Sequence, residues 1–136
     1  MRYDTKIAIV VRDDLATWQK LNVASFLAGG LVGTAPELAG EPYRDASGRF
    51  YGPLIRQPVL VFVAGAAELT TALQRAQQRG VRPHIYTKEL FATGNDVDNR
   101  AAVAAMATDA LDLVGLGLHA ERKEIDKITK GLKLHG

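Results

Sequence analysis

Residues 6–30 read KIAIVVRDDLATWQKLNVASFLAGG, and this stretch decides the fold. The run from Lys6 to Val11 is short, unbroken and rich in β-branched residues, which is typical of a strand buried on both faces of a sheet. A charged turn follows. Residues 17–28 then have the pattern of a helix that ends at Gly29 and Gly30, where a left-handed backbone costs least. In an open α/β sheet, the turn between such a strand and such a helix is where a ligand site is built.

The rest of the chain alternates between short apolar runs and helical patterns. On a helical wheel, the first helix turns one set of side chains to the core, namely Leu21, Ala24, Leu27, Ala28 and Leu31. Residues 43–51 predict a small β-hairpin around an Asp45–Gly48 turn. Further strands are expected at 58–63, 81–86, 111–118 and 132–134, and further helices at 66–79, 95–109 and 121–130. This order predicts a three-layer α/β/α sandwich around a mixed sheet of four or five strands, as a single domain over residues 1–136.

Finer features of this pattern concern individual residues. Pro83 lacks an N–H group, so the strand at 81–86 should begin irregularly or lie at an edge of the sheet. Gly115 and Gly117 fall on one face of their strand, which indicates that another element packs closely there. Leu90 and Phe91 are apolar anchors in an otherwise polar loop. Asn95 or Asp96 has the character of a helix N-cap.

Composition excludes several classes of protein. The chain has 136 residues, no cysteine and a net charge of +2. Without cysteine there are no disulfides, thiolate metal sites or cysteine nucleophiles, which fits a cytoplasmic protein. No segment has the length and apolarity of a membrane span, so we expect no membrane partner. The mild positive charge permits contact with phosphate but does not indicate a nucleic-acid binder.

The usual catalytic and cofactor motifs are missing. The three histidines, His84, His119 and His135, lack the spacing of a helical zinc site. Ser25 and Ser47 do not stand in a nucleophile elbow, and no phosphate-binding loop or dinucleotide fingerprint is present. We therefore expect no metal and no cofactor.

Three charged residues near the first turn are the candidates for chemistry. Arg12 has the fork geometry to clamp a carboxylate or a phosphate. Asp14 is a candidate base or orienting group, or alternatively a helix N-cap or an ion-pair partner of Arg12. Lys20 lies in the first turn of the helix, where the helix dipole disfavours a cation, and in a hydrolytic reaction it would stabilise developing negative charge. Lys20 and Asp14 are therefore the predicted catalytic residues. The alternative is that Lys20 is only a solvated surface charge.

A second loop is expected to face this turn. If the first and third strands are parallel, their carboxyl ends open at the same edge of the sheet, and the loops that follow them meet across a crevice. We expect Arg12 and Asn22 to share a ligand site with Thr87, Thr93, Asn95 and Asp96. Such a lining suits a small anionic ligand better than a long RNA backbone. The alternative is that Asn95 and Asp96 only cap a helix and Arg12 only pairs with Asp13 or Asp14.

The opening of the chain resembles that of type-two peptidyl-tRNA hydrolases. Val-Val-Arg-Asp-Asp-Leu at 10–15 and Lys20 are similar to that family's strand ending in Val-Arg-x-Asp-Leu and its following Gly-Lys-x-Ala-Ala-Gln-x-x-His-Ala helix. The match requires a gap of one residue, which puts the family's glutamine on Ala24 and its histidine on Leu27. The resemblance implies a related fold and, as an alternative function, hydrolysis of peptidyl-tRNA or a related ester or amide. tRNA is a possible partner on this basis but not the favoured one.

A second resemblance covers nearly the whole chain. The segment from Trp18 to Ala24, the Asp45–Gly48 turn, Thr87-Lys-Glu-Leu-Phe and Gly131-Leu-Lys-Leu-His together resemble the bacterial family called domain of unknown function 2000. That family is similar in fold to the hydrolases, and it implies no particular activity.

The hairpin at 43–51 also predicts an oligomer. It presents Tyr43, Phe50 and Tyr51, and a small domain rarely leaves such an aromatic cluster in water. We expect a homodimer.

Overall fold

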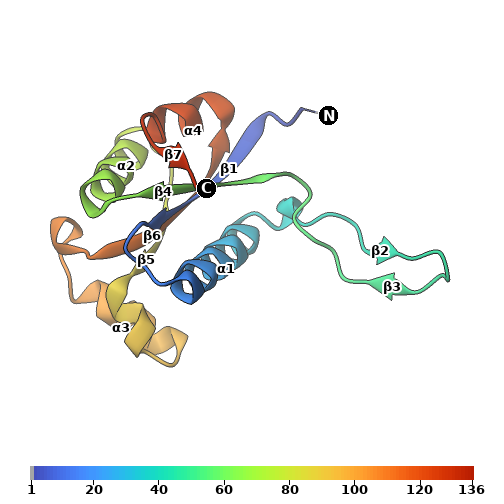
Figure 1. Cartoon of the computed structure of the whole chain (residues 1–136), viewed down its shortest axis with the longest axis horizontal. Helices are drawn as coiled ribbons and strands as arrows, with labels where there is room; N and C mark the ends of the chain where they lie inside the picture. Colours follow the sequence, from blue (N-terminus) through green and yellow to red (C-terminus); the bar gives the residue numbers. More distant parts are fainter. Residues whose placement is uncertain (1) are drawn as a thin grey trace.

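The computed structural model describes residues 2–136. Its centre is a five-stranded mixed sheet in the order β5-β6-β1-β4-β7 (Figure 1). The central strand β1 (Thr5–Arg12) pairs in parallel with β4 (Val59–Ala64) and antiparallel with β6 (Leu113–Glu121). The edge strands β5 (His84–Thr87) and β7 (Lys133–Leu134) run antiparallel to β6 and β4. The predicted mixed sheet is therefore confirmed, with five strands.

The four α-helices in the described part of the chain are α1 (Thr17–Thr34), α2 (Ala66–Gln78), α3 (Asp96–Ala104) and α4 (Arg122–Ile128). Three of them cover the two faces of this sheet, and α3 packs beside the segment that follows β5 (residues 88–92). Successive side chains of a strand point to opposite faces. Ala8 and Val10 of β1 accordingly join the core under α2 and α4, whereas Ile7, Ile9 and Val11 join the core under α1. Two separate cores on one sheet give the α/β/α layering seen in Figure 1.

Helix α1 is longer than predicted, and the expected stop at Gly29 and Gly30 is wrong. Both glycines keep helical backbone, because the apolar spacing of Val23, Leu27 and Leu31 continues past them and buries all three side chains. Gly30 instead permits a close approach, since a Cβ there would lie 3.2 Å from the ring of His84. The observed core face of α1 is rotated slightly from the one that the helical wheel predicted. Leu21, which was expected to face the core, is 65% exposed.

The closeness predicted for Gly115 and Gly117 is confirmed. Both lie on β6 directly beneath α1, where a Cβ at Gly115 would collide with Val23 Cγ1 and a Cβ at Gly117 would lie 3.3 Å from Leu27 Cβ. The missing side chains let the helix backbone settle onto the sheet. The strand itself is shifted from its predicted range, running Leu113–Glu121.

The segment from β5 to β6 follows the predicted order of elements, but its helix ends earlier than predicted. β5 starts at His84, after Pro83, at an edge of the sheet as predicted. The anchors Leu90 and Phe91 lie in a 3-10 helix, η2 (Lys88–Ala92), and pack against the core under α1. Helix α3 ends at Ala104 rather than near 109, followed by a 3-10 turn, η3 (Thr108–Ala110). No residue of α3 is fully buried, so no packing extends the helix beyond three turns.

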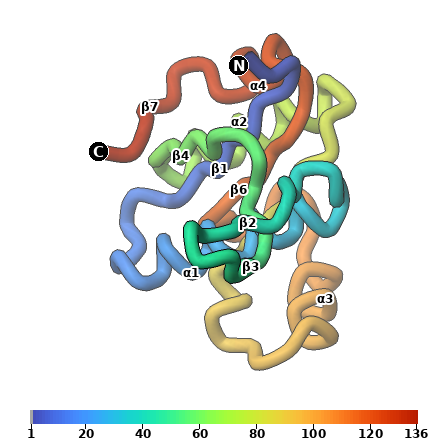
Figure 2. The backbone as a smooth tube through the Cα atoms, turned by 90° about the vertical axis from the view of Figure 1, so that its right-hand side faces the viewer, coloured from blue at the N-terminus to red at the C-terminus, as the bar shows by residue number. Residues whose placement is uncertain are grey.

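The predicted hairpin is present as β2 (Tyr43–Arg44) and β3 (Phe50–Tyr51). Its turn is fixed by Asp45, whose side chain accepts hydrogen bonds from the backbone N–H groups of Ser47 and Arg49. Gly48 supplies the left-handed backbone that closes the turn, with φ of 86°. The hairpin projects far from the body of the molecule, as Figure 1 shows, and in Figure 2 it points toward the viewer in front of the body.

Candidate functional site

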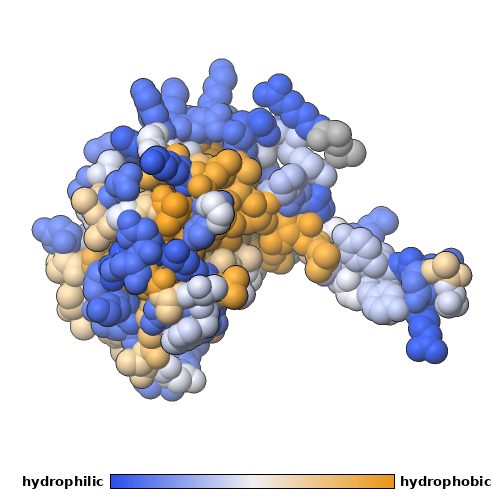
Figure 3. Space-filling model, viewed as in Figure 1, coloured by the Kyte–Doolittle hydropathy of each residue, from blue (hydrophilic) through white to orange (hydrophobic). Residues whose placement is uncertain are grey.

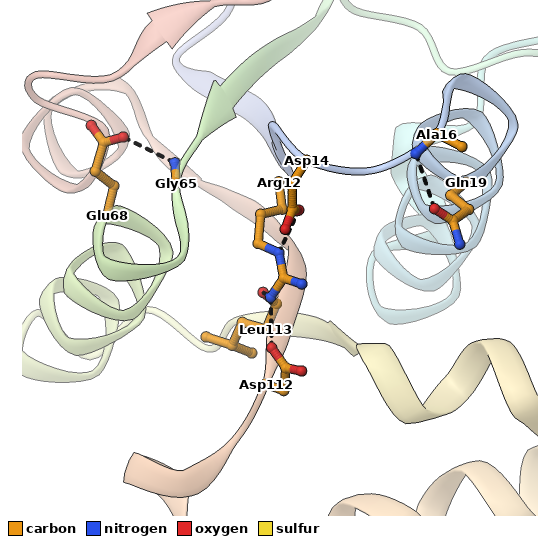
Figure 4. A network of polar contacts seen from close by, with 8 residues as sticks. All are labelled: Arg12, Asp14, Ala16, Gln19, Gly65, Glu68, Asp112 and Leu113. Atoms are coloured by element: carbon orange, nitrogen blue, oxygen red, sulfur yellow. Dashed lines mark hydrogen bonds and ion pairs between the residues drawn. The ribbon is translucent and has the colours of Figure 1, made fainter.

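Arg12, the last residue of β1, is a buried clamp between two strands. Its Nε donates to Asp14 Oδ1 at 2.7 Å, and its Nη1 donates to Asp112 Oδ1 at 2.6 Å and to the Leu113 carbonyl oxygen at 3.1 Å (Figure 4). The residue is 8% exposed. The guanidinium therefore ties the end of β1 to the start of β6.

The charges of this cluster stabilise one another. Burial disfavours the charge on Arg12, but hydrogen bonds to Asp14 and Asp112 outweigh it, so the pKa of Arg12 is raised. The same hydrogen bond from Arg12 is the main cause that lowers the pKa of Asp14, with a weaker attraction from Lys88. One buried cation between two carboxylates leaves no excess positive charge. Arg12 is consequently engaged within the fold rather than presented to a ligand anion.

The two predicted loops do lie at one edge of the sheet. β1 and β5 both run antiparallel to β6, so they are parallel to each other and end on the same side. The backbone N–H of Lys88, just after β5, donates to the Asp112 carbonyl oxygen at 2.9 Å, next to the Arg12 cluster. The side chain of Thr87, however, is buried in the core rather than open to the crevice.

Lys20 is turned away from this loop. The Lys20 ammonium lies 3.1 Å from His135 Nε2, and the backbone of His135 is bonded to β4 at Val61. Trp18 instead contacts Phe91 of η2. Two positions along a helix differ by about 200° of rotation, so Lys20 and Trp18 point to opposite sides of α1. Asn22 is exposed and follows Trp18 by four residues, so it lies on the side of α1 that faces η2.

The remaining predicted residues lie around the start of α3. Thr93 Oγ1 donates to the Leu90 carbonyl oxygen at 3.0 Å. Asn95 caps α3, because its Oδ1 accepts from the backbone N–H of Asp98 at 2.8 Å. Asp96 forms an ion pair with Arg100, one turn further along the helix. Like the contacts of Arg12, these contacts stabilise the local structure, here that of the loop and of the first turn of α3.

A cleft of about 540 Å³ opens beside these residues, between α1, β5, η2 and α3. Its walls combine apolar side chains with a few polar groups, namely Phe26, Leu27, Gly30, His84, Ile85, Tyr86, Leu90, Asp96, Asn99, Arg100, Val103 and Ala104. Asp96 is the predicted residue that reaches this lining, whereas Arg12, Asp14 and Lys20 lie outside it. Asp96, Asn99, Arg100 and Val103 follow helical spacing, which is the signal in the sequence that could have indicated this face.

Aromatic rings line up behind one wall of the cleft. Trp18 stands edge-on to Phe91, with ring centroids 5.9 Å apart. Phe91 in turn lies 5.1 Å from Tyr86, and Tyr86 lies 5.7 Å from Phe26. Burial raises the pKa of the Tyr86 hydroxyl. Phe26 and Tyr86 are the members of this row that line the cleft, and they give it an aromatic, apolar wall.

His84 is a second group in the cleft wall whose pKa is shifted. Burial, and then the charge of Arg82, lower its pKa, although the backbone of Gly30 partly opposes them. Its Nε2 lies 2.8 Å from Thr34 Oγ1 on α1. The imidazole is therefore neutral at pH 7, and it joins β5 to α1 without adding charge.

Residues 2–136 contain no group of three or more His, Cys, Asp or Glu side chains suited to hold a metal ion. Over the same residues, no helix combines the length and apolarity needed to cross a membrane.

Comparison with known proteins assigns the chain to a family. The family described as "Protein of unknown function (DUF2000)" matches residues 5–136, so this chain belongs to that family. A solved structure of a protein of unknown function from Agrobacterium tumefaciens strain C58 is similar, with 47% sequence identity and a TM-score of 0.96. The match covers 99% of this chain and 100% of the other. Among curated proteins, none matches.

Proposed function

We propose that this protein binds a small organic molecule with an apolar body and one anionic group in the cleft between α1 and α3. The observation that carries the proposal is the cleft itself. Its volume of about 540 Å³ lies within the range of small-molecule sites, roughly 300–1,000 Å³. Apolar walls with a few convergent polar groups are also the composition of such sites.

The polar end of the cleft supports an anionic group on the ligand. Arg100 is paired with Asp96, but their side chains are 66% and 80% exposed. An exposed pair of this kind contributes only about 0.3–0.5 kcal/mol, so a ligand carboxylate can replace Asp96 as the partner of Arg100. Asn99 also lines the cleft from α3 and adds an amide donor.

Two alanines of α3 provide a matched test. Ala104 lines the cleft, whereas Ala101 is outside its lining, and both are exposed on the same helix. With 2-naphthoate as the probe, we expect Ala104→Trp to weaken binding at least about tenfold by filling the cleft, and Ala101→Trp to leave it unchanged. Isothermal titration calorimetry measures both. Equal affinities in the two variants, or no binding to the wild type, would contradict the proposal.

The anionic group is tested separately with the neutral analogue 2-naphthamide. We expect 2-naphthoate to bind more tightly than the amide in the wild type, and Arg100→Gln to remove that difference. If both compounds bind equally well to the wild type, the cleft recognises the apolar body alone.

We also propose that this protein belongs to the same superfamily as the type-two peptidyl-tRNA hydrolases, on the basis of the resemblance in sequence. We do not propose that it catalyses their reaction. Lys20 contacts His135 rather than Asp14, and Leu27, at the position of the hydrolase histidine, is buried in the core. When catalytic residues act as a unit, the loss of one member lowers the reaction rate by far more than that member's proportional share.

We therefore expect that the purified protein does not hydrolyse peptidyl-tRNA at a rate useful to a cell. Release of the peptidyl group from a model peptidyl-tRNA measures this, with an authentic type-two hydrolase as the positive control. Turnover comparable to that control would contradict the expectation, and loss of such turnover in Lys20→Ala would establish the reaction instead.

A further inference from the structure

The β2–β3 hairpin is an ordered arm with exposed aromatic side chains. Tyr43, Phe50 and Tyr51 are 54%, 72% and 54% exposed. The arm has a defined shape, because Tyr51 donates to Asp45 Oδ2 at 2.7 Å and the Arg44 guanidinium lies over the Phe50 ring. Strands of two residues are too short for a hairpin that is stable on its own in water. The arm therefore needs a surface to pack on, and Figure 1 shows it standing away from its own body.

The base of the arm leads to an incompletely covered part of the sheet. Helix α1 packs over β1, β6 and β5, which leaves β4 at the side of that layer. Val59 and Val61 of β4 are consequently only partly buried at the margin of this core, whereas Ile7 and Ile9 beside them on β1 are fully buried. We call Leu54, Ile55, Val59 and Val61 the uncovered strip. Figure 3 shows apolar residues gathered over the middle of the molecule and continuing to the base of the arm.

We infer that the uncovered strip is filled by the β2–β3 arm of a second copy of this chain, in a reciprocal exchange of arms. The area favours this occupant. The exposed parts of the three aromatic rings amount to roughly 350–400 Å² per arm, given about 200 Å² for each whole ring. Two arms, each covering an equal area of the other copy, bury roughly 1,500 Å², the size of a stable interface. One arm docked on an unrelated protein would bury half of that, which is below this range.

Two-fold symmetry makes the exchange self-consistent. In an isologous dimer the same two surfaces meet twice, so each copy needs one arm and one strip. Both are present on this chain, and they are joined through Leu54 and Ile55 at the base of the arm. The exchange removes both exposed apolar features from water at once.

The test compares two equally exposed apolar residues. Phe50 on the arm and Val97 on α3 are 72% and 66% exposed. By sedimentation equilibrium at micromolar concentration, we expect the wild type at twice the chain mass of 14.7 kDa. Phe50→Glu should weaken the dimer at least about tenfold, because aromatic side chains dominate such interfaces, whereas Val97→Glu should leave it intact. Unchanged circular dichroism shows that Phe50→Glu still folds.

A cross-link locates the arm. The chain has no cysteine, so single cysteines report on one contact each. When Phe50→Cys protein and Val61→Cys protein are mixed and oxidised, we expect a disulfide between the two different chains. A monomeric wild type, a Phe50→Glu dimer of undiminished affinity, or a dimer without this mixed disulfide would overturn the inference.

Discussion

Replacing Gly115 with valine is expected to lower the free energy of unfolding by about 3 kcal/mol, the upper part of the usual cost of overpacking a core. A Cβ at this position would collide with Val23 Cγ1 and would lie 3.0 Å from Leu27 Cδ1. Both neighbours are buried, and Val23 is β-branched and fixed in a helix, so neither can move aside cheaply. Helix α1 would have to lift from β6, which disturbs the whole core under α1. Urea denaturation followed by circular dichroism measures the change.

Gly29→Ala is the matched control for this prediction. Gly29 lies in the interior of α1, and nothing lies within 4 Å of a Cβ built there. Alanine in a helix interior is more favourable than glycine by about 0.5–1 kcal/mol, so this variant should be more stable than the wild type. A Gly115→Val protein as stable as the wild type would mean that α1 does not rest directly on β6.

The elements that follow from local pattern were predictable from the sequence. The β-branched run of β1 and the Asp45–Gly48 turn each depend on residues adjacent in the chain, and both are confirmed. The glycines of β6 were predictable because side chains alternate along a strand. The length of α1 was not, because Gly29 and Gly30 stop a helix only where packing does not continue it, and here Leu31 is buried.

The candidate cleft depends on contacts that local pattern does not contain. The direction of the strands correctly brought the turn after β1 and the loop after β5 to one edge of the sheet. The rotation of α1 about its axis decides which of its side chains face this edge of the sheet. In the structure, that rotation turns Lys20 toward His135. Asp112, the second carboxylate on Arg12, is 100 residues away in the chain and carried no motif that marked it. The cleft wall from α3 likewise exists only once α3 is placed beside α1.

Removing the Arg12 clamp is the second change with a large expected effect. We expect Arg12→Met to lower the free energy of unfolding by about 2–3 kcal/mol, since a hydrogen bond to a charged group contributes about 1.5–3 kcal/mol. The loss stays below that of two such bonds, because Asp14 and Asp112 remain partly in water and keep their hydration when the cation is gone. Arg12→Lys should recover only part of the loss, because an ammonium lacks the fork that reaches Asp14 and Asp112 together. Urea denaturation at pH 7 measures all three proteins.

The dependence on pH separates this clamp from simple packing of the Arg12 side chain. Arg12 lowers the pKa of Asp14 below its ordinary value of 3.8, so the folded protein holds the Asp14 carboxylate more strongly than the unfolded chain does. The stability from this pair is therefore fully present above pH about 4 and is lost as the pH falls toward the lowered pKa of the folded state. The wild type should exceed Asp14→Asn in stability at pH 7, and the two should converge in acid. If their difference stays constant down to pH about 2, the Asp14 carboxylate contributes no charge interaction, and Arg12 stabilises the edge through Asp112 and Leu113 alone.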